Sequence, residues 1–253
     1  QFDQPTILGG NVLAPLSDGS TVSVRVHHAH IEADAGKSTH PAGKDYSLVD
    51  LNRAGTPLIE IVSEPDMHTA EEAKSYAREL YLLMKYAGVS NANLYYGNMR
   101  FDVNVSVSKT SELGTRTETK NLNSFRSVEK AVEFETARQI KELEAGNVII
   151  QETRGWDDAK QITISQRSKE DAHDYRYFPE PDIPPIIIEK DQVEEYRSKL
   201  PSMPGEIRAR LAEVGVDRMA IEAILEYPEL ARRWEEIRVT GAPVKSLKKI
   251  ADW

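Results

Sequence analysis

The stretch MRFDVNVSVSKTSELGTRTETKNLN, residues 99–123, decides the fold class, because two segments of strictly alternating side chains flank a short loop. Alternation with a period of two is typical of β-strands that bury one face. Since the loop at 108–114 permits an antiparallel return, polar side chains of both strands can line one face. The sequence therefore predicts a charged β-hairpin, whose polar face carries Arg100, Asp102, Arg116, Glu118 and Lys120.

Two interpretations of this charged face remain open. The first is an ordinary solvated sheet with cross-strand ion pairs. The second is a binding site, because the hairpin runs through Asn121 and Asn123 into a predicted helix, and a helix N-terminus favours anions. Two carboxylates among three cations can hold a Mg²⁺ ion together with the phosphate that it neutralises.

The rest of residues 1–190 has the mixed pattern of an α+β domain. Alternating or β-branched segments predict strands near residues 20–31, 46–50, 57–63, 92–108, 115–121, 148–153, 161–166 and 185–188. We expect a largely antiparallel sheet that forms a cradle with packed helices. A small all-helical domain is expected at 191–253, where helix-forming segments replace the strand pattern, and it is expected to stop short of its C-terminal end.

Two helices are predicted within the mixed region. The first spans residues 69–88 and opens with a capping box formed by Thr69 and Glu72. The second spans residues 124–145 and ends before Gly146. Its stripe is less regular and is expected to include Val128, Ala131, Val132, Glu135 and Ile140.

Composition excludes several classes of protein. The 253 residues carry a formal charge of −9, so bulk attraction to nucleic acid is not expected and any RNA contact needs a local basic patch. Without cysteine, neither disulfides nor thiol chemistry contribute. No apolar run is long enough to span a membrane, and no signal peptide is visible. A cytoplasmic location is expected, or an organellar matrix in a eukaryote.

A second polar cluster lies upstream of the hairpin. His30, Glu32 and Asp34 alternate, so three oxygen or nitrogen ligands can face one way, although a polar strand edge gives the same pattern. The GKS at 36–38 is not a P-loop, because position 31 is not the glycine that this motif requires. Glu60 interrupts an apolar run, which leaves two interpretations open. If the strand is buried, the carboxylate needs a cation or a metal as its partner, whereas an outward-facing glutamate on an edge strand needs neither.

Several motifs in order resemble one known family. They are DAGKSTH at 34–40, YSLVDLNRAGTPLIEIVSEPD at 46–66, KNLNSF at 120–125, QETR at 151–154 and DYRYFPEPD at 174–182. This set is similar to the B subunits of the glutamyl/aspartyl-tRNA amidotransferase, over about residues 1–190. The resemblance implies a catalytic cradle at 1–190 that lacks an N-terminal strand, followed by the start of a helical tRNA-binding domain at 191–253.

The resemblance also implies an activity. Members of this family activate the side-chain carboxylate of a misacylated Glu-tRNA(Gln) or Asp-tRNA(Asn) with ATP and Mg²⁺, forming an acyl phosphate. Ammonia from an amidase-type glutaminase, the A subunit, then displaces phosphate, and a small C subunit completes the complex. Phosphoryl transfer depends mostly on positioning and charge neutralisation, which suits a charged hairpin.

Site residues follow from the resemblance together with the pattern of the hairpin and of the helix start after it. Those expected to act in catalysis are Arg100, Asp102, Glu118 and Lys120. Those expected to ligate Mg²⁺ are His30, Glu32, Glu60 and Asp102. Those expected to bind ATP are Lys37, Arg116, Asn121 and Asn123. Arg176, within DYRYF, is a further candidate, although an arginine among aromatic residues is often structural.

The sequence departs from the family pattern at two places. Ala33 stands where the H-x-E-E-D segment has its second glutamate, a metal ligand in the family. Residues 95–102, YYGNMRFD, replace E-x-G-S-x-R-C-D and keep only the glycine, arginine and aspartate. The leading hypothesis is therefore a fragment of an amidotransferase B subunit. Its rivals are a tRNA-binding or assembly module that has lost catalysis, and an unrelated Mg²⁺-dependent phosphotransferase.

Overall fold

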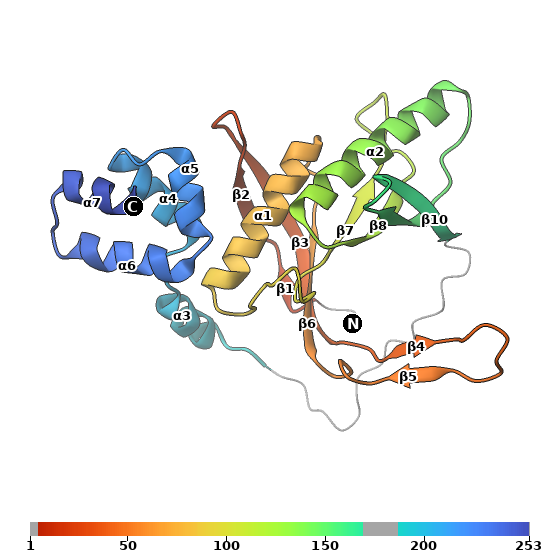
Figure 1. Ribbon diagram of the computed structural model, residues 1–253, viewed down its shortest axis with the longest axis horizontal. Coiled ribbons are helices and arrows are strands. Elements are labelled where there is room, and N and C mark those ends of the chain that lie inside the picture. The colour runs from red at the N-terminus through yellow and green to blue at the C-terminus, as the bar shows by residue number, and fades with distance from the viewer. Residues whose placement is uncertain (1–4, 169–186, 253) are drawn as a thin grey trace. The chain divides into compact units, whose positions relative to one another are not determined.

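The computed structural model describes residues 5–168 and 187–252 of the chain, apart from a few side chains (Figure 1). Contacts divide it into two compact units. The described part of the first unit is residues 5–12 and 23–66, and that of the second is residues 13–22, 67–168 and 187–252. The segment DYRYFPEPD, with Arg176, lies outside the described residues.

Strands dominate the first unit. A four-stranded sheet has the order β1-β3-β2, and β6 pairs with β3. Its strands are β1 (Ile7–Leu8), β2 (Asn11–Pro15), β3 (Thr21–Ala33) and β6 (Pro57–Ser63), of which β2 and β3 also reach into the second unit. A separate two-stranded ribbon pairs β4 (Lys37–Thr39) with β5 (Leu48–Asp50).

The second unit contains a four-stranded sheet and the helices. The sheet order is β10-β9-β8-β7, in which β8 and β9 are parallel and the other pairs are antiparallel. Its strands are β7 (Phe101–Val105), β8 (Thr117–Leu122), β9 (Glu152–Asp157) and β10 (Ile162–Ser168). The predicted α+β class, with mixed and largely antiparallel sheets beside packed helices, is confirmed.

Two long helices pack together in this unit, α1 (Ala70–Tyr86) and α2 (Phe125–Glu144). The predicted capping box is present, since Thr69 accepts from the Glu72 N–H and the Glu72 side chain accepts from the Thr69 N–H. Ser124 caps α2 in a similar way, by accepting from the Ser127 N–H. A small apolar cluster joins both helices to β8, and its buried residues are Ala73, Ala77, Leu122, Val128 and Ala131.

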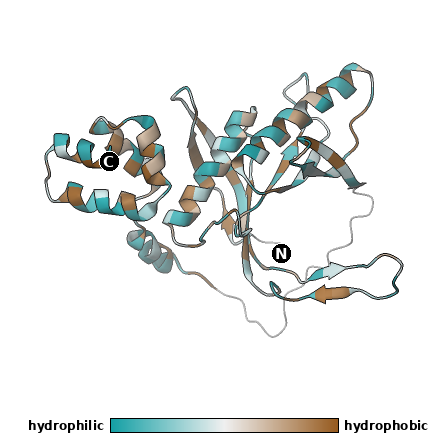
Figure 2. Cartoon of the chain, viewed as in Figure 1, coloured by the Kyte–Doolittle hydropathy of each residue, from teal (hydrophilic) through white to brown (hydrophobic). Residues whose placement is uncertain are grey.

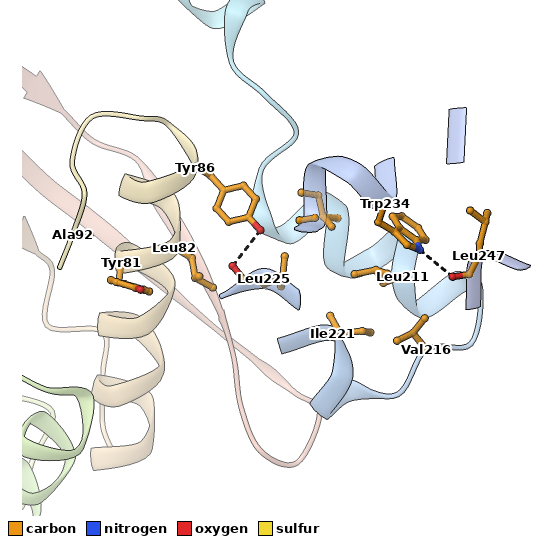
Figure 3. Packing of buried hydrophobic residues seen from close by; sticks show 12 residues of the cluster. Tyr81, Leu82, Tyr86, Ala92, Leu211, Val216, Ile221, Leu225, Trp234 and Leu247 are labelled. Atoms are coloured by element: carbon orange, nitrogen blue, oxygen red, sulfur yellow. Dashed lines mark hydrogen bonds between the residues drawn. The ribbon is translucent and has the colours of Figure 1, made fainter. Parts of the chain in front are cut away.

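Five shorter helices follow, α3 (Lys190–Lys199), α4 (Pro204–Glu213), α5 (Arg218–Leu225), α6 (Pro228–Val239) and α7 (Val244–Ala251). Helix α3 is mostly hydrophilic, whereas α4 to α7 combine hydrophobic and hydrophilic residues, as expected of amphipathic helices (Figure 2). Leu211, Leu225 and Trp234 form a buried cluster with Leu82 and Tyr86 of α1 (Figure 3). The domain boundary near residue 190 stays a prediction.

The short strands β1, β2 and β4 were not predicted from the sequence, and several predicted segments differ from the structure. Of the strand predicted at 92–108, only Phe101–Val105 is a strand, with a turn at 94–97, and β9 begins at Glu152 rather than 148. Residues 187–188 are not in a strand, whereas 185–186 lie outside the described residues. On α2, Ile140 is 40% exposed and Gln139 is buried instead. No helix in the described part of the chain has the length and apolar character needed to cross a bilayer.

Candidate functional site

Three of the predicted charged residues meet on the β7–β8 strand pair. The Lys120 ammonium donates to Asp102 Oδ2 at 2.8 Å and lies 3.2 Å from Glu118 Oε1. Asp102 is nearly half exposed and the other two side chains are partly buried, so the cluster opens to solvent. The prediction that these three side chains share one face is confirmed.

A β-bulge lies at the centre of this cluster. Phe101 pairs with Leu122, whereas Val103 pairs with Thr119, so two residues of β8, Lys120 and Asn121, lie opposite the single residue Asp102. A bulge redirects the side chains of the strand that carries it, and bulges are frequent beside functional sites. Here the extra residue accompanies the close approach of the Lys120 ammonium to the Asp102 carboxylate.

The opposite face of β8 is fixed by helix α2. Thr117 and Thr119 alternate with the charged residues and are fully buried. The Glu135 carboxylate, also fully buried, accepts hydrogen bonds from Thr117 at 2.7 Å and from Thr163 of β10 at 2.9 Å. Because the pleat alternates, these buried contacts determine that Glu118 and Lys120 point to the other face.

Two arginines complete the network around Glu135. Arg138 donates to Glu135 Oε2 at 2.9 Å, and the Arg154 guanidinium lies 3.4 Å from the same oxygen. Burial opposes ionisation of Glu135, but hydrogen bonds from Arg138, Thr117 and Gln139 outweigh it and hold its pKa below the ordinary value. Glu135 therefore remains a carboxylate inside the protein.

The electrostatics of the exposed cluster keep Lys120 charged. Burial disfavours its ammonium form, but the hydrogen bond and negative charge of Asp102, together with Glu118, raise the pKa of Lys120 above its ordinary value. A fixed cation between two carboxylates can neutralise the charge of a phosphoryl group. It can also hold the carboxylates ready for a divalent ion that arrives with a nucleotide.

Thr153 belongs to this cluster but was missed by the sequence prediction. It lies on β9, in parallel register with Glu118, and its hydroxyl donates to Glu118 Oε2 at 3.2 Å. The signal that points to it is the QETR segment at 151–154, which the family resemblance includes. Alternation alone does not reveal Thr153, because its contact depends on the parallel pairing of β8 with β9.

The other predicted residues of the second unit are less defined. Arg100 and Arg116 are exposed just before β7 and β8, and Asn123 is exposed between β8 and α2. Asn121 lies in β8, but its side chain is outside the described part of the structure. Their roles in binding ATP or in catalysis stay predictions.

In the first unit, His30 and Glu60 are direct cross-strand partners between β3 and β6. Glu32 is two residues along β3 and pairs with Leu58, so it shares the face of His30. His30 is mostly buried and its ring packs edge-on against His28, with centroids 4.8 Å apart. Two of the predicted metal ligands are therefore adjacent in the backbone register, and a third lies on the same face.

The remaining polar residues of the first unit have other surroundings. Asp34 forms an ion pair with Arg53 at 2.9 Å, and Lys37 is exposed at the start of β4. Over the described ranges 5–168 and 187–252, no group of three histidine or acidic side chains is arranged to hold a metal ion. The Mg²⁺ ligands therefore stay a prediction.

Comparison with known proteins supports the family resemblance. The family model described as "GatB/GatE catalytic domain" matches residues 1–194. The whole chain is 44% identical to the B subunit of the aspartyl/glutamyl-tRNA(Asn/Gln) amidotransferase of Caldicellulosiruptor saccharolyticus, of which it covers 52%. It is 45% identical to the chloroplastic/mitochondrial B-1 subunit of the glutamyl-tRNA(Gln) amidotransferase of Micromonas commoda, of which it covers 48%.

A third relative shows higher identity over a shorter range. The corresponding B subunit of Alcanivorax borkumensis is 52% identical over 83% of this chain and 44% of its own length. The chain thus spans about half the length of the curated relatives that it matches. Because the catalytic-domain model matches well over half of the sequence, the chain belongs to the GatB/GatE catalytic domain family.

Proposed function

We propose that this chain is the catalytic part of the B subunit of a tRNA-dependent amidotransferase. In its complete complex it converts Glu-tRNA(Gln) or Asp-tRNA(Asn) to the amide, using ATP, Mg²⁺ and ammonia from a glutaminase A subunit, with a small C subunit as the third partner. The observation that carries the proposal is the cluster of Asp102, Glu118 and Lys120 in a chain of this family. The reaction takes place where translation occurs, in the cytoplasm or an organellar matrix.

The reaction has two balanced steps. A carboxylate oxygen of the aminoacyl side chain attacks the γ-phosphorus of ATP, and ADP leaves. The ammonia nitrogen then attacks the activated carbonyl carbon, the bond from this carbon to the phosphate oxygen breaks, and inorganic phosphate leaves with the proton that nitrogen loses. Lys120 neutralises charge on the transferred phosphoryl group, while Thr153 and Lys120 hold the Glu118 carboxylate in place.

The donor set of the cluster fits a magnesium ion that arrives with its nucleotide. Mg²⁺ is usually held by one or two carboxylates together with substrate phosphates and water, rather than by a complete protein cage. Asp102 and Glu118 provide two such carboxylates within reach of one ammonium group. His30, Glu32 and Glu60 form a second proposed donor set, based on the register of β3 and β6.

The test is amidation by the complete complex that contains the full-length protein. We expect conversion of Glu-tRNA(Gln) or Asp-tRNA(Asn) that requires ATP and glutamine, and Lys120→Met is expected to lower the turnover rate by about 10²-fold or more. Lys130→Met is the matched control, because Lys130 forms an exposed ion pair with Glu133 on α2. Normal tRNA binding without any amidation by the unmodified complex would favour the non-catalytic module instead.

A further inference from the structure

A turn between α1 and β7 displays two tyrosines to solvent. Tyr95 is 90% exposed and Tyr96 is 73% exposed, although large aromatic side chains usually bury most of their surface. Their rings pack edge-on against each other, with centroids 5.1 Å apart. Tyr96 thereby supports the Tyr95 ring, most of which remains exposed.

Hydrogen bonds within the turn define its conformation. Asn93 Oδ1 accepts from the Tyr96 N–H at 3.1 Å, and the Asn93 carbonyl accepts from the Asn98 N–H at 2.9 Å. Gly97 adopts a φ of +67°, which glycine tolerates without strain. The exposed position of Tyr95 is therefore a property of an ordered turn, and binding at its ring requires little further ordering of the chain.

Tyr95 borders an open surface pocket of about 460 Å³ in which aromatic and amide side chains come together. Phe125 lines its wall, and the amides of Asn91 and Asn93 provide hydrogen-bond donors and acceptors. The volume lies within the range of sites for small ligands, about 300–1,000 Å³. The combination of aromatic rings and amides is the one that proteins use to stack and read an unpaired base.

The charges that line the pocket compensate each other. Glu226 accepts a hydrogen bond from the Tyr81 hydroxyl at 2.6 Å, and the Lys85 ammonium lies 4.0 Å from Glu226. Lys85 also donates to the Glu226 carbonyl at 2.7 Å. Because Lys85 and Glu226 already have these partners, the pocket favours a neutral ring over a phosphate or a carboxylate.

Aromatic contacts link the pocket to the strand pair that carries the charged cluster. The Phe125 ring lies 5.9 Å from the ring of Phe101, the first residue of β7, and Asp102 follows directly. The pocket therefore lies beside the end of β7 where the cluster begins. A nucleotide that bears an aminoacyl group would be anchored near that end of the strand pair.

We propose that Tyr95, supported by Tyr96, is a stacking platform for the unpaired base at the 3′ end of the tRNA, with Asn91 and Asn93 reading the edge of the base. This inference rests on the proposed function, which makes an aminoacylated RNA end the substrate. An exposed tyrosine also suits a protein interface, but the pocket amides and the neutral lining favour a base.

The experiment measures the Kd of uncharged tRNA(Gln) for the full-length protein in its complex. Tyr95→Ala is expected to weaken binding by about 5- to 150-fold, the effect of losing one base–aromatic stack, while Tyr95→Phe retains the ring and is expected to bind normally. A tRNA(Gln) shortened by its 3′-terminal nucleotide is the second probe. With this probe, Tyr95→Ala is expected to have little effect, because the stacked base is already gone.

Three outcomes would overturn the platform. They are an unchanged Kd in Tyr95→Ala, an equal loss with the shortened tRNA, and loss of complex assembly with normal tRNA binding, which would assign the tyrosines to a protein partner. Amidation by the unmodified complex separates the two proposals. If the unmodified complex amidates its substrate while Tyr95→Ala binds tRNA normally, only the stacking platform is wrong. If tRNA binding depends on Tyr95 but the unmodified complex shows no amidation, only the proposed function is wrong.

Discussion

Glu135 offers the sharpest test of how the charged face is held in place. The carboxylate is fully buried and accepts hydrogen bonds from Thr117, Thr163 and Arg138. Glu135→Gln keeps the shape of the side chain but removes the charge and directs an amide donor toward groups that are themselves donors. The arginines around it then lose their buried counter-charge.

The expected cost is about 3 kcal/mol of unfolding free energy. Breaking a buried ion pair costs roughly 3–5 kcal/mol, and the low end applies because water reaches part of the Arg138 side chain, which is 22% exposed. Urea unfolding of the chain at pH 7 measures this change. Glu133→Gln on the same helix is the matched control, since its exposed pair with Lys130 is worth no more than about 1 kcal/mol.

The pH dependence follows from the lowered pKa of Glu135. A carboxylate whose pKa is lower in the folded state stabilises the protein above its unfolded pKa, about 4.3, and this stability is lost as the pH falls through the folded pKa. The difference between the unmodified chain and Glu135→Gln is therefore expected to shrink below about pH 4.3. A difference below about 0.5 kcal/mol at pH 7, or one that stays constant down to about pH 3, would refute the reasoning.

Two further substitutions test the packing of the C-terminal helices on α1. Arg208→Met is expected to cost about 3–5 kcal/mol in urea unfolding, because it removes the ion-pair partner 2.8 Å from the buried Glu79 and one of the two arginines paired with Glu222, which keeps Arg78. Adding Glu79→Gln should recover part of the loss. Leu225→Ala is expected to cost about 2–5 kcal/mol of unfolding free energy, because Leu225 is fully buried. As a control, Leu230→Ala on the exposed side of α6 should change the unfolding free energy by less than about 0.5 kcal/mol. Similar losses for both variants would contradict the assigned core.

Local signals in the sequence predicted much of this structure. Thr69 and Glu72 have the spacing of a capping box, and both reciprocal hydrogen bonds form. The alternation around Asp102 and Lys120 predicted a shared face, and their side chains meet at 2.8 Å. Such patterns are informative because they depend on residues close together in the chain or on one period of the strand.

Features that depend on distant pairing were not predictable in this way. The bulge at Lys120 and Asn121 arises from the register of β8 against β7, and the contact of Thr153 with Glu118 arises from parallel pairing. Hydrogen bonds to Asn93 and the positive φ of Gly97 override the strand propensity of residues 92–98.

Helix α2 shows why an apolar pattern is not always the buried one. Gln139 is fully buried because its amide donates to the Val105 carbonyl at 3.0 Å and to the Thr117 hydroxyl at 3.0 Å, while the neighbouring Ile140 remains 40% exposed. Partners on β7 and β8 satisfy the amide N–H groups, whereas the Gln139 Oε1 atom is buried without a hydrogen-bond partner among the described residues. A hydrophobic stripe counted along the helix alone does not reveal those partners.

The Mg²⁺ dependence of amidation in Asp102→Asn tests the central claim most directly. The substitution keeps the size of the side chain, removes its charge, and leaves Lys120 with Glu118 as its remaining ion-pair partner in the cluster. In the complete complex we expect the rate of Glu-tRNA(Gln) amidation to fall by about 10²-fold or more, with a higher Mg²⁺ concentration needed for half-maximal rate. An unchanged rate and an unchanged Mg²⁺ titration would contradict the assignment of this cluster as the site of phosphoryl transfer.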